Sequence, residues 1–318
     1  MDLASLSVNF LTKYSKHDNY EQYRRQRSTM STRDIVKKIV IEEFSKLIHL
    51  IKTDFTLNYE RKVNNFLLSQ MDEFITASMV FVSSFESKSG FAIETCAKRI
   101  ARLTFGEENV PSVVNPRNLE HHIDPSRISG QVVVTDVDTG NGDLRGEIAS
   151  FIANNVANGK GKSREESKVT HATCQATLLP LSTKYRSSQI YTKPVDLAFF
   201  DGTVWNIMEL KAGGNLDSSN APSNVEKLLT IYVDMGIENC KAYFATLYNK
   251  DGEGNTWKGA VKKHLHYPSM FLIGANFWKM ILPAEITYDE FTEIYREALE
   301  EIDLNKQITN RISLCTGR

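Results

Sequence analysis

Several features that would mark a particular class of protein are missing from this sequence. Only four cysteines occur in 318 residues, at 96, 174, 240 and 315, and no two of them form a Cys-x-x-Cys pair. This scarcity argues against a zinc site or a disulfide framework, so we expect reduced, buried thiols. No signal peptide and no apolar run of about 18 residues is found, which predicts a soluble, cytosolic protein without a membrane span. Internal repeats and low-complexity tracts are also lacking.

Excess charge of either sign is missing as well. The chain has 38 Lys and Arg against 39 Asp and Glu, a net charge of −1, and an isoelectric point near 6.7. A protein that binds nucleic acid through bulk positive charge is therefore excluded, and any DNA-binding surface must come from local clusters. With 41% hydrophobic residues, the chain is long enough to bury one large core or two modest ones.

What the sequence does contain is an informative segment from Lys193 to Gly214. Residues 195–200 and 203–210 are rich in β-branched and aromatic residues, and Asp201-Gly202 between them is a strong hairpin signal. A two-residue turn would place Asp196 about opposite Ile207 and one diagonal step from Glu209. Glu209 and Lys211 are two apart in a strand, so their side chains share a face. The pattern predicts that Asp196, Glu209 and Lys211 lie together at one end of a sheet.

Such a trio suits metal-assisted hydrolysis of a phosphodiester. Two carboxylates a few ångströms apart hold a hard cation such as Mg²⁺, which keeps some water ligands and binds substrate phosphate oxygens. Lys211 beside them can orient the attacking water, help to deprotonate it, or stabilise the negative transition state, and the sequence does not choose among these. Gly213 and Gly214 follow at once, and they allow a backbone turn close to a phosphate chain.

At Pro194-Val195-Asp196 and Glu209-Leu210-Lys211 the chain resembles the PD-(D/E)XK nuclease superfamily. Further similarity, over roughly residues 190–282, is to a group of type II restriction endonucleases that recognise short interrupted GG/CC palindromes. The segments that carry this second resemblance are Glu209–Asp217, Ala242–Asn249, Gly252–Lys258 and Leu272–Trp278. The resemblance implies an α/β core, a mixed central sheet flanked by helices, and Mg²⁺ as cofactor. It also implies a homodimer that hydrolyses both strands of double-stranded DNA and leaves 5′-phosphates.

Three regions are expected along the chain: an N-terminal helical region at 1–82, a nuclease core at 83–285, and a C-terminal helix at 286–318 packed on the core. Helices are predicted from a cap at Ser31 onward, at 58–79, at about 83–103, at 146–156, from Val225 to Met235, at 257–266 and at 287–304. Strands are predicted at 174–181 and 241–247 besides the hairpin, with a parallel crossover from the hairpin to 241–247. Trp257 and Trp278 are expected to anchor the core.

A third metal ligand is expected from the helix that begins the core. In restriction enzymes of this superfamily an acidic residue of that helix often assists metal binding, and by this resemblance Glu94 is assigned the role, with Glu86 and Glu147 as rivals. An exposed Glu94 paired with Lys98 at i+4 is the alternative. Residues 136–147 invite comparison with a calcium loop, but Gly140 and Asn141 stand in the reverse of the EF-hand order, which favours a plain acidic turn.

Local basic clusters supply the candidate DNA-binding residues. The segment 160–171 has glycine-rich flanks and precedes the hairpin, which favours a loop that becomes ordered on DNA. Arg186 lies just before the first hairpin strand, and a second basic cluster spans 258–266. We therefore predict DNA contacts by a set of basic residues, with an ordinary solvated surface as the alternative for each cluster: Lys162, Arg164, Lys168, Arg186, Lys258 and Lys262.

Two other functions remain open at this stage. One is a repair nuclease of the same fold that recognises DNA structure and cuts without regard to sequence. The other is a DNA-binding or scaffold protein that keeps the hairpin without activity, although the intact trio argues against it. A glycosidase that uses Asp196 and Glu209 as acid and base is disfavoured by the adjacent Lys211 and by the lack of aromatic sugar platforms.

Overall fold

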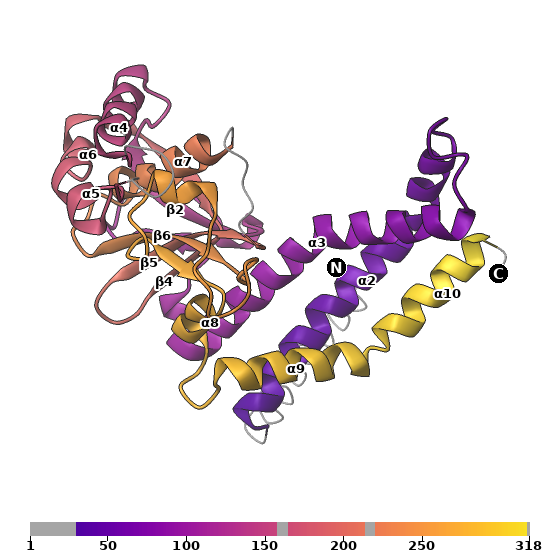
Figure 1. Ribbon diagram of the computed structural model, residues 1–318. Helices are drawn as coiled ribbons and strands as arrows, with labels where there is room; N and C mark the ends of the chain where they lie inside the picture. Colours follow the sequence, from indigo (N-terminus) through magenta and orange to yellow (C-terminus); the bar gives the residue numbers. More distant parts are fainter. Residues whose placement is uncertain (1–29, 158–164, 214–219, 317–318) are drawn as a thin grey trace, which may run out of the picture.

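The computed structural model describes residues 30–157, 165–213 and 220–316 of the chain. It has an α/β body at one end and an arm of long helices that projects from it (Figure 1). The strands of the body are β1 (Val113–Val114), β2 (Gln131–Val137), β3 (Arg186–Val195), β4 (Leu197–Phe200), β5 (Trp205–Lys211), β6 (Cys240–Thr246) and β7 (Phe271–Ile273). Its helices are α4 (Gly142–Asn155), α5 (His171–Thr177), α6 (Leu181–Lys184), α7 (Ala221–Met235) and α8 (Ala275–Ile281), with short 3-10 turns at Glu107–Asn109, Pro125–Arg127 and Ala260–Lys263.

Strand hydrogen bonds form two mixed sheets where the sequence predicted one. The first sheet has the order β1-β2-β3, with a parallel and an antiparallel pair, and the second has the order β4-β5-β6-β7, with an antiparallel pair followed by two parallel ones. The sheets meet at Asp196, the single residue between β3 and β4. The Gln131 side chain joins them, because its amide donates to the Ala198 carbonyl at 2.8 Å and accepts from the Ala198 N–H at 2.9 Å. Gln131 thereby replaces the backbone pairing that is lost at the joint.

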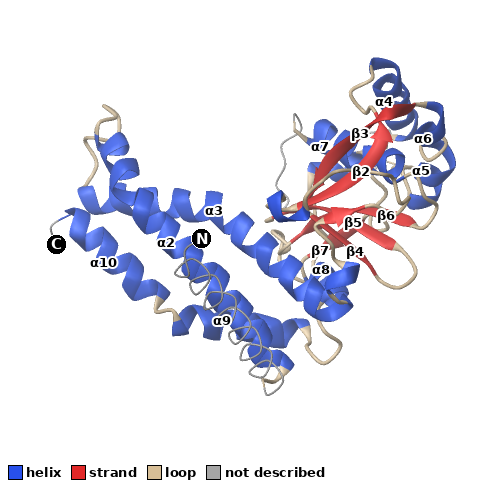
Figure 2. Cartoon of the chain, turned by 180° about the vertical axis from the view of Figure 1, so that it is seen from behind, coloured by secondary structure: helices blue, strands red, loops and turns tan. Residues whose placement is uncertain are grey.

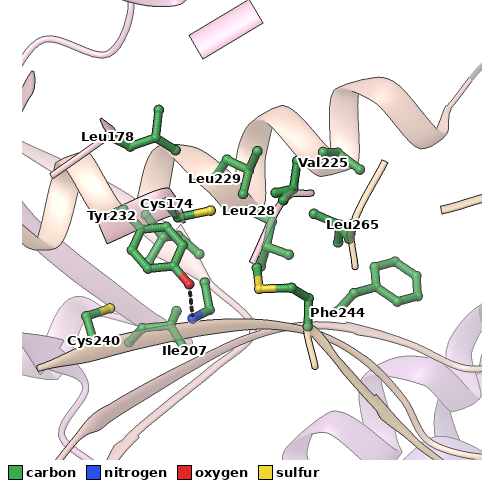
Figure 3. Packing of buried hydrophobic residues seen from close by; sticks show 14 of the residues in the cluster. Cys174, Leu178, Ile207, Val225, Leu228, Leu229, Tyr232, Cys240, Phe244 and Leu265 are labelled. Carbon is green, nitrogen blue, oxygen red and sulfur yellow. Dashed lines mark hydrogen bonds between the residues drawn. The ribbon is translucent and has the colours of Figure 1, made fainter. Parts of the chain in front are cut away.

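Helix α7 is the predicted crossover that returns the chain from β5 to the parallel strand β6. Its buried face, which includes Leu228, Leu229 and Tyr232, packs on the sheet above Ile207 and Phe244 (Figure 3). The Tyr232 hydroxyl accepts a hydrogen bond from Ala242 N at 3.2 Å, so the buried phenol is satisfied within this core. The helix ends at Gly236, whose positive φ of 57° is the usual left-handed C-cap.

A second core covers the opposite face of the β4–β7 sheet. Leu197, Phe199, Met208 and Leu210 point to this side and pack against the C-terminal half of α3 (Glu73–Phe105) together with α8. Phe105 stacks on Phe199 with ring centroids 4.4 Å apart. The sheet is therefore buried between α7 on one face and α3 on the other, which explains why most residues of β5 are apolar, with Asn206, Glu209 and Lys211 as the exceptions.

The arm is built from α2 (Thr32–Val63), the N-terminal half of α3, α9 (Tyr288–Glu301) and α10 (Leu304–Thr316), which lie side by side in both views (Figure 2). Helix α2 begins at the predicted cap, since Ser31 Oγ accepts from Asp34 N. Helix α3 has 33 residues, about 50 Å, and runs without a break through residues 82 and 83, where the helical region was expected to end and the core to begin.

The tip of the arm is apolar and exposed. Phe66 and Leu67, in the turns between α2 and α3, are 79% and 67% exposed. The other large apolar side chains that are exposed between residues 57 and 82 are Leu57, Val63, Met71, Phe74, Ile75, Met79 and Val82. A surface of this kind is uncommon on a monomer.

Several local predictions are wrong. Residues 171–177 and 181–184 form the helices α5 and α6 in place of a strand, because Thr170 and Thr173 make a reciprocal capping box. The segment 257–266 contains only a short 3-10 turn in place of a basic helix. A turn region at 64–72 interrupts the helix expected at 58–79. Trp257 and Trp278 are buried, as predicted.

The structure also bears on the cysteines and on the expected lack of a membrane span. Cys96, Cys174 and Cys240 are free and buried, as predicted, whereas the side chain of Cys315 lies outside the described part. Within the described ranges, even the longest helices lack an apolar stretch sufficient to cross a bilayer.

Candidate active site

Strand β5 carries charged residues near its end, Glu209 and Lys211, whereas the residues before them are uncharged. Ile207 points to the α7 side and Met208 and Leu210 point to the α3 side, so alternation places Glu209 on the side of α7. Glu209 is only 3% exposed, although every neighbour in the strand core is apolar or neutral. A buried carboxylate in such a strand needs charged or hydrogen-bonding partners.

Asp196 lies directly opposite Glu209, not one diagonal step away as predicted. The observed pairs Leu197↔Met208 and Phe200↔Trp205 set the register, and its next pair is Asp196 with Glu209. The difference arises because the loop has four residues, 201–204. The Asp201 carboxylate closes this loop by accepting from the backbone N–H groups of Thr203 and Val204. Asp196 Oδ2 in turn accepts from Leu210 N at 2.8 Å, which fixes its carboxylate against β5.

Two lysines neutralise the carboxylates. Lys211 Nζ donates to Glu209 Oε1 at 2.7 Å. Lys227, from α7, donates to Glu209 Oε2 at 2.6 Å and lies 3.9 Å from Asp196 Oδ1. Lys211 was predicted, whereas Lys227 was missed, since no spacing along the chain connects it with β5. Only the path of the crossover helix brings Lys227 to the end of that strand.

The electrostatic environment reflects this crowding. Burial and the nearby Glu209 charge raise the pKa of Asp196, against the lowering effect of Lys227, the Leu210 N–H and Lys211. Burial alone would lower the pKa of Lys227, but its hydrogen bond to Glu209 and the charges of both carboxylates raise it. The ammonium of Lys227 therefore stays charged and holds two carboxylates that would otherwise repel each other.

Glu94 approaches the same site from α3. Burial raises the pKa of Glu94 to about 7, and the charges of Asp196 and Glu209 contribute to the rise. The two other acids considered for this role have different surroundings. Glu147 of α4 accepts a hydrogen bond from Tyr185 at 2.5 Å and pairs with Lys184. Glu86 is not among the residues that line the cavity next to Asp196, which is described below. Of the three acids considered, Glu94 is the one beside the pair.

A cavity of about 580 Å³ opens beside Asp196 on the α3 side and is lined by both Glu94 and Asp196. Its other walls carry the cations Lys46, Lys98, Arg99 and Arg102. Arg99 is tied to Glu42 and Glu43 at 2.6 and 2.7 Å. Lys98, by contrast, has no direct hydrogen-bond or ion-pair partner within the described part of the chain, and burial lowers its pKa. The charges of Glu94 and Asp196 act in the opposite direction, so the Lys98 ammonium stands in a cavity where it could also contact an anionic group from solution.

The donor set fits a hard divalent cation. Asp196 and Glu209 present carboxylate oxygens, the ligands that Mg²⁺ prefers, and the cation that now bridges them is the Lys227 ammonium. Across the described ranges no three acidic, histidine or cysteine side chains are gathered closely enough to hold a metal ion between them. Glu94 thus stands near the pair without closing a three-ligand cluster.

The glycine after the trio packs closely against aromatic side chains. A Cβ on Gly213 would lie 2.6 Å from the Tyr248 ring, and Trp257 Nε1 donates to the Gly213 carbonyl at 3.4 Å. Gly213 therefore accommodates the packing of two aromatic side chains, and its close approach to a phosphate chain stays a prediction. Gly214 lies outside the described residues.

The predicted DNA-binding residues fall into separate groups. Lys162 and Arg164 lie outside the described residues. Arg186 starts β3 and pairs with Asp136 at 3.0 Å. Asp196 follows the other end of that ten-residue strand. Since a strand rises about 3.3 Å per residue, Arg186 and Asp196 lie about 30 Å apart.

Lys258 and Lys262 line a separate hollow of about 330 Å³ with Glu166. Lys168 is exposed one residue before Val169, whose carbonyl accepts from His266 N. The two basic segments that were predicted independently, 160–171 and 258–266, thus come together in the described part through residues 165–169.

The acidic segment 136–147 runs from the end of β2 through a turn at 138–141 into α4, which begins four residues earlier than the helix predicted at 146–156. Both oxygens of Asp136 face guanidinium groups, from Arg117 at 2.7 Å and Arg186 at 3.0 Å. Asn141 caps α4 by accepting from Asp143 N and Leu144 N. The polar atoms of this segment are thus used for ion pairing and helix capping.

Comparison with known proteins agrees with this geometry. The model of the family described as type II restriction endonuclease, HinfI, matches residues 117–298, more than half of the chain. The match contains Asp196, Glu209, Lys211 and Lys227, and it begins after Glu94. No match was found among curated proteins or among solved structures. The chain belongs to the HinfI family of type II restriction endonucleases, which are enzymes that cleave DNA.

Proposed function

We propose that this protein is a magnesium-dependent, sequence-specific endonuclease whose active site is formed by Asp196, Glu209 and Lys211. The observation that carries the proposal is the juxtaposition of two carboxylates, Asp196 at the joint before β4 and Glu209 on β5, both beside Lys227, with Lys211 at 2.7 Å from Glu209. Asp196 and Glu209 would hold the ion, and Glu94 would assist from α3. When bound, Mg²⁺ supplies a positive charge that polarises a phosphoryl oxygen and offsets the charge that builds up in the transition state.

The chain's own groups account for the rest of the hydrolysis. Lys211 orients the attacking water, helps to remove its proton, or stabilises the charge at phosphorus. The water oxygen forms a bond to phosphorus while the bond to the 3′ oxygen breaks, and the proton finally resides on that oxygen. The products are a 5′-phosphate and a 3′-hydroxyl. Lys98, without a direct partner in the described structure, is proposed to bind a backbone phosphate in the cavity beside Asp196.

We further propose that the recognised site is a short interrupted palindrome, with GG/CC favoured by the sequence resemblance of residues 190–282. A palindrome is matched by two-fold symmetry, and two strands require two copies of the trio, so a homodimer is the expected active form. The exposed apolar tip of the arm, around Phe66 and Leu67, supports this proposal because a second copy would cover it. DNA contacts are proposed for Lys168, Arg186, Lys258 and Lys262, with Lys162 and Arg164 as further candidates by sequence.

The test is digestion of a plasmid of known sequence with and without Mg²⁺, followed by mapping of the ends. The wild type should give discrete fragments with 5′-phosphates, and a chelator should stop cleavage. Glu209→Gln, Asp196→Asn and Lys211→Met should each lower cleavage by at least about a hundredfold, because the first two remove a proposed metal ligand and the third removes the group that acts on the attacking water. Lys98→Met should weaken DNA binding and flatten its salt dependence.

Glu300→Gln, an exposed change on α9, is the matched control and should cleave normally. Full activity in all three variants of the trio would refute the assignment. A smear in place of discrete bands would favour the alternative of a structure-directed nuclease.

A further inference from the structure

Lys227 occupies a particular place between the two carboxylates. It comes from α7, and its Nζ lies 2.6 Å from Glu209 Oε2 and 3.9 Å from Asp196 Oδ1. Its side chain is still 45% exposed, so the aliphatic stem reaches from solvent into the site.

The other oxygens of the pair have different partners. Glu209 Oε1 accepts from Lys211, and Asp196 Oδ2 accepts from the backbone N–H of Leu210. The two remaining oxygens, Oε2 of Glu209 and Oδ1 of Asp196, both face Lys227. Lys211 and Lys227 thus neutralise the same buried Glu209 from different sides, and only Lys227 stands between the two acids.

We propose that Lys227 is a resident counter-ion that occupies the cation position between Asp196 and Glu209 and must be displaced before a divalent metal ion binds there. The proposal rests on the function proposed above, because it assumes that these carboxylates bind the metal. Lys227 is then a positioning residue: it keeps the two acids at their register in the metal-free protein and lowers the affinity of that protein for metal.

Both the distances and the charges at the site indicate that Lys227 and a metal ion would exclude each other. A magnesium ion bound by the two facing oxygens sits about 2.0–2.1 Å from each, and an ammonium at 2.6 Å from one of them cannot share that place. With neither Lys227 nor a metal ion between the acids, Glu209 would be a buried charge neutralised only by Lys211, next to the like charge of Asp196. Because Lys227 is half exposed, it can swing into solvent while the buried face of α7, with Leu228 and Leu229, stays packed.

The test is calorimetric titration of the full chain with Mg²⁺ alone, in the absence of DNA. Lys227→Met and Lys227→Gln should each bind Mg²⁺ about tenfold more tightly than the wild type, the effect of removing one partly exposed ion pair that competes for the site. Lys211→Met is the matched control, because it removes an equally close positive charge from the oxygen of Glu209 that does not face Asp196. It should tighten binding by much less. Lys279→Met, an exposed change on α8, should leave the affinity unchanged.

The outcomes separate this proposal from the function on which it rests. If Lys227→Gln and Lys211→Met tighten binding to the same extent, the effect is one of net charge and the displacement is refuted. If the wild type binds Mg²⁺, Glu209→Gln abolishes binding, and both Lys227 variants bind like the wild type, only the counter-ion role fails. If neither the wild type nor any variant binds Mg²⁺, the metal-dependent function fails, and the counter-ion role fails with it. Using two variants of Lys227 guards against misfolding of one of them, which circular dichroism would reveal.

Discussion

Asp234 offers a direct test of how burial controls ionisation in this fold. It lies near the end of α7, is 3% exposed, and its Oδ1 has no hydrogen-bond partner in the described structure. Burial raises the pKa of Asp234 from 3.8 to about 7, even though Lys193, a hydrogen bond from Thr135 and the charge of Arg117 act in the opposite direction. The neutral form of this carboxyl is therefore the one that suits the fold.

The sign of the stability effect follows from this difference. Between pH 3.8 and about 7 the folded state holds more protons than the unfolded state, so the free energy of unfolding falls as the pH rises through this window. Each pKa unit corresponds to about 1.36 kcal/mol, so the raised pKa of Asp234 lowers the free energy of unfolding by about 4 kcal/mol at pH 8 and by about 2 kcal/mol at pH 5, relative to acid conditions in which the carboxyl is protonated in both states. Asp234→Asn removes this dependence, because the amide does not titrate.

The amide of Asn has a cost of its own. Its NH₂ group would replace the unpartnered Oδ1 and remain without an acceptor, which costs about 1–3 kcal/mol. We therefore expect Asp234→Asn to raise the free energy of unfolding by about 2 kcal/mol at pH 8 and to leave it nearly unchanged at pH 5. The difference between the two pH values, about 2 kcal/mol, does not depend on the cost of the amide.

Urea denaturation followed by tryptophan fluorescence at pH 5 and pH 8 measures this difference. The exposed change Glu300→Gln should give the same small effect at both pH values and serves as control. An equal effect of Asp234→Asn at pH 5 and pH 8 would show that its carboxyl ionises normally, and the argument from burial would be wrong.

Two further predictions concern the joint between the sheets and the arm. Gln131→Leu should lower the free energy of unfolding by about 2–4 kcal/mol in the same urea assay, because both backbone groups of Ala198 lose their buried partner; a loss below 1 kcal/mol would contradict the bridging role. The double change Phe66→Ser and Leu67→Ser should convert a dimer into monomers in analytical ultracentrifugation without loss of stability, since both side chains are exposed in the single chain. An unchanged dimer would place the interface elsewhere.

Sequence patterns predicted which residues meet at the site better than they predicted the strand register. Asp196, Glu209 and Lys211 do come together, because alternation within a strand and the existence of a hairpin are local properties. The register was wrong by two residues because Asp201-Gly202 favours a two-residue turn. The Asp201 side chain instead binds backbone N–H groups and stabilises a longer loop.

Other errors have equally specific causes. The segment from Cys174 to Leu181 was predicted as a strand from its alternating pattern. Its buried residues Cys174, Leu178 and Leu181 are spaced by four and three, a helical period. Conversely, Trp257, Val261 and Leu265 recur every four residues and suggested a helix, but Gly259 lets the chain fold back against the Trp257 ring. A close approach of this kind depends on tertiary packing, which a local pattern does not contain.

The position of Asp196 explains why local sequence patterns do not predict the full arrangement of the site. A residue inside one sheet is placed by its two neighbouring strands, whereas Asp196 lies where β3 leaves one sheet and β4 enters another. Its carboxylate is set by the β4–β5 register, by the Leu210 N–H, and by the Gln131 bridge that holds the sheets together. Because the joint interrupts backbone pairing, an oxygen of Asp196 stays available for a cation, and the crossover helix provides Lys227 there. The break between the sheets thus supports the metal-binding role proposed for Asp196, since in a continuous strand backbone pairing and side-chain packing would leave less room for a cation beside it.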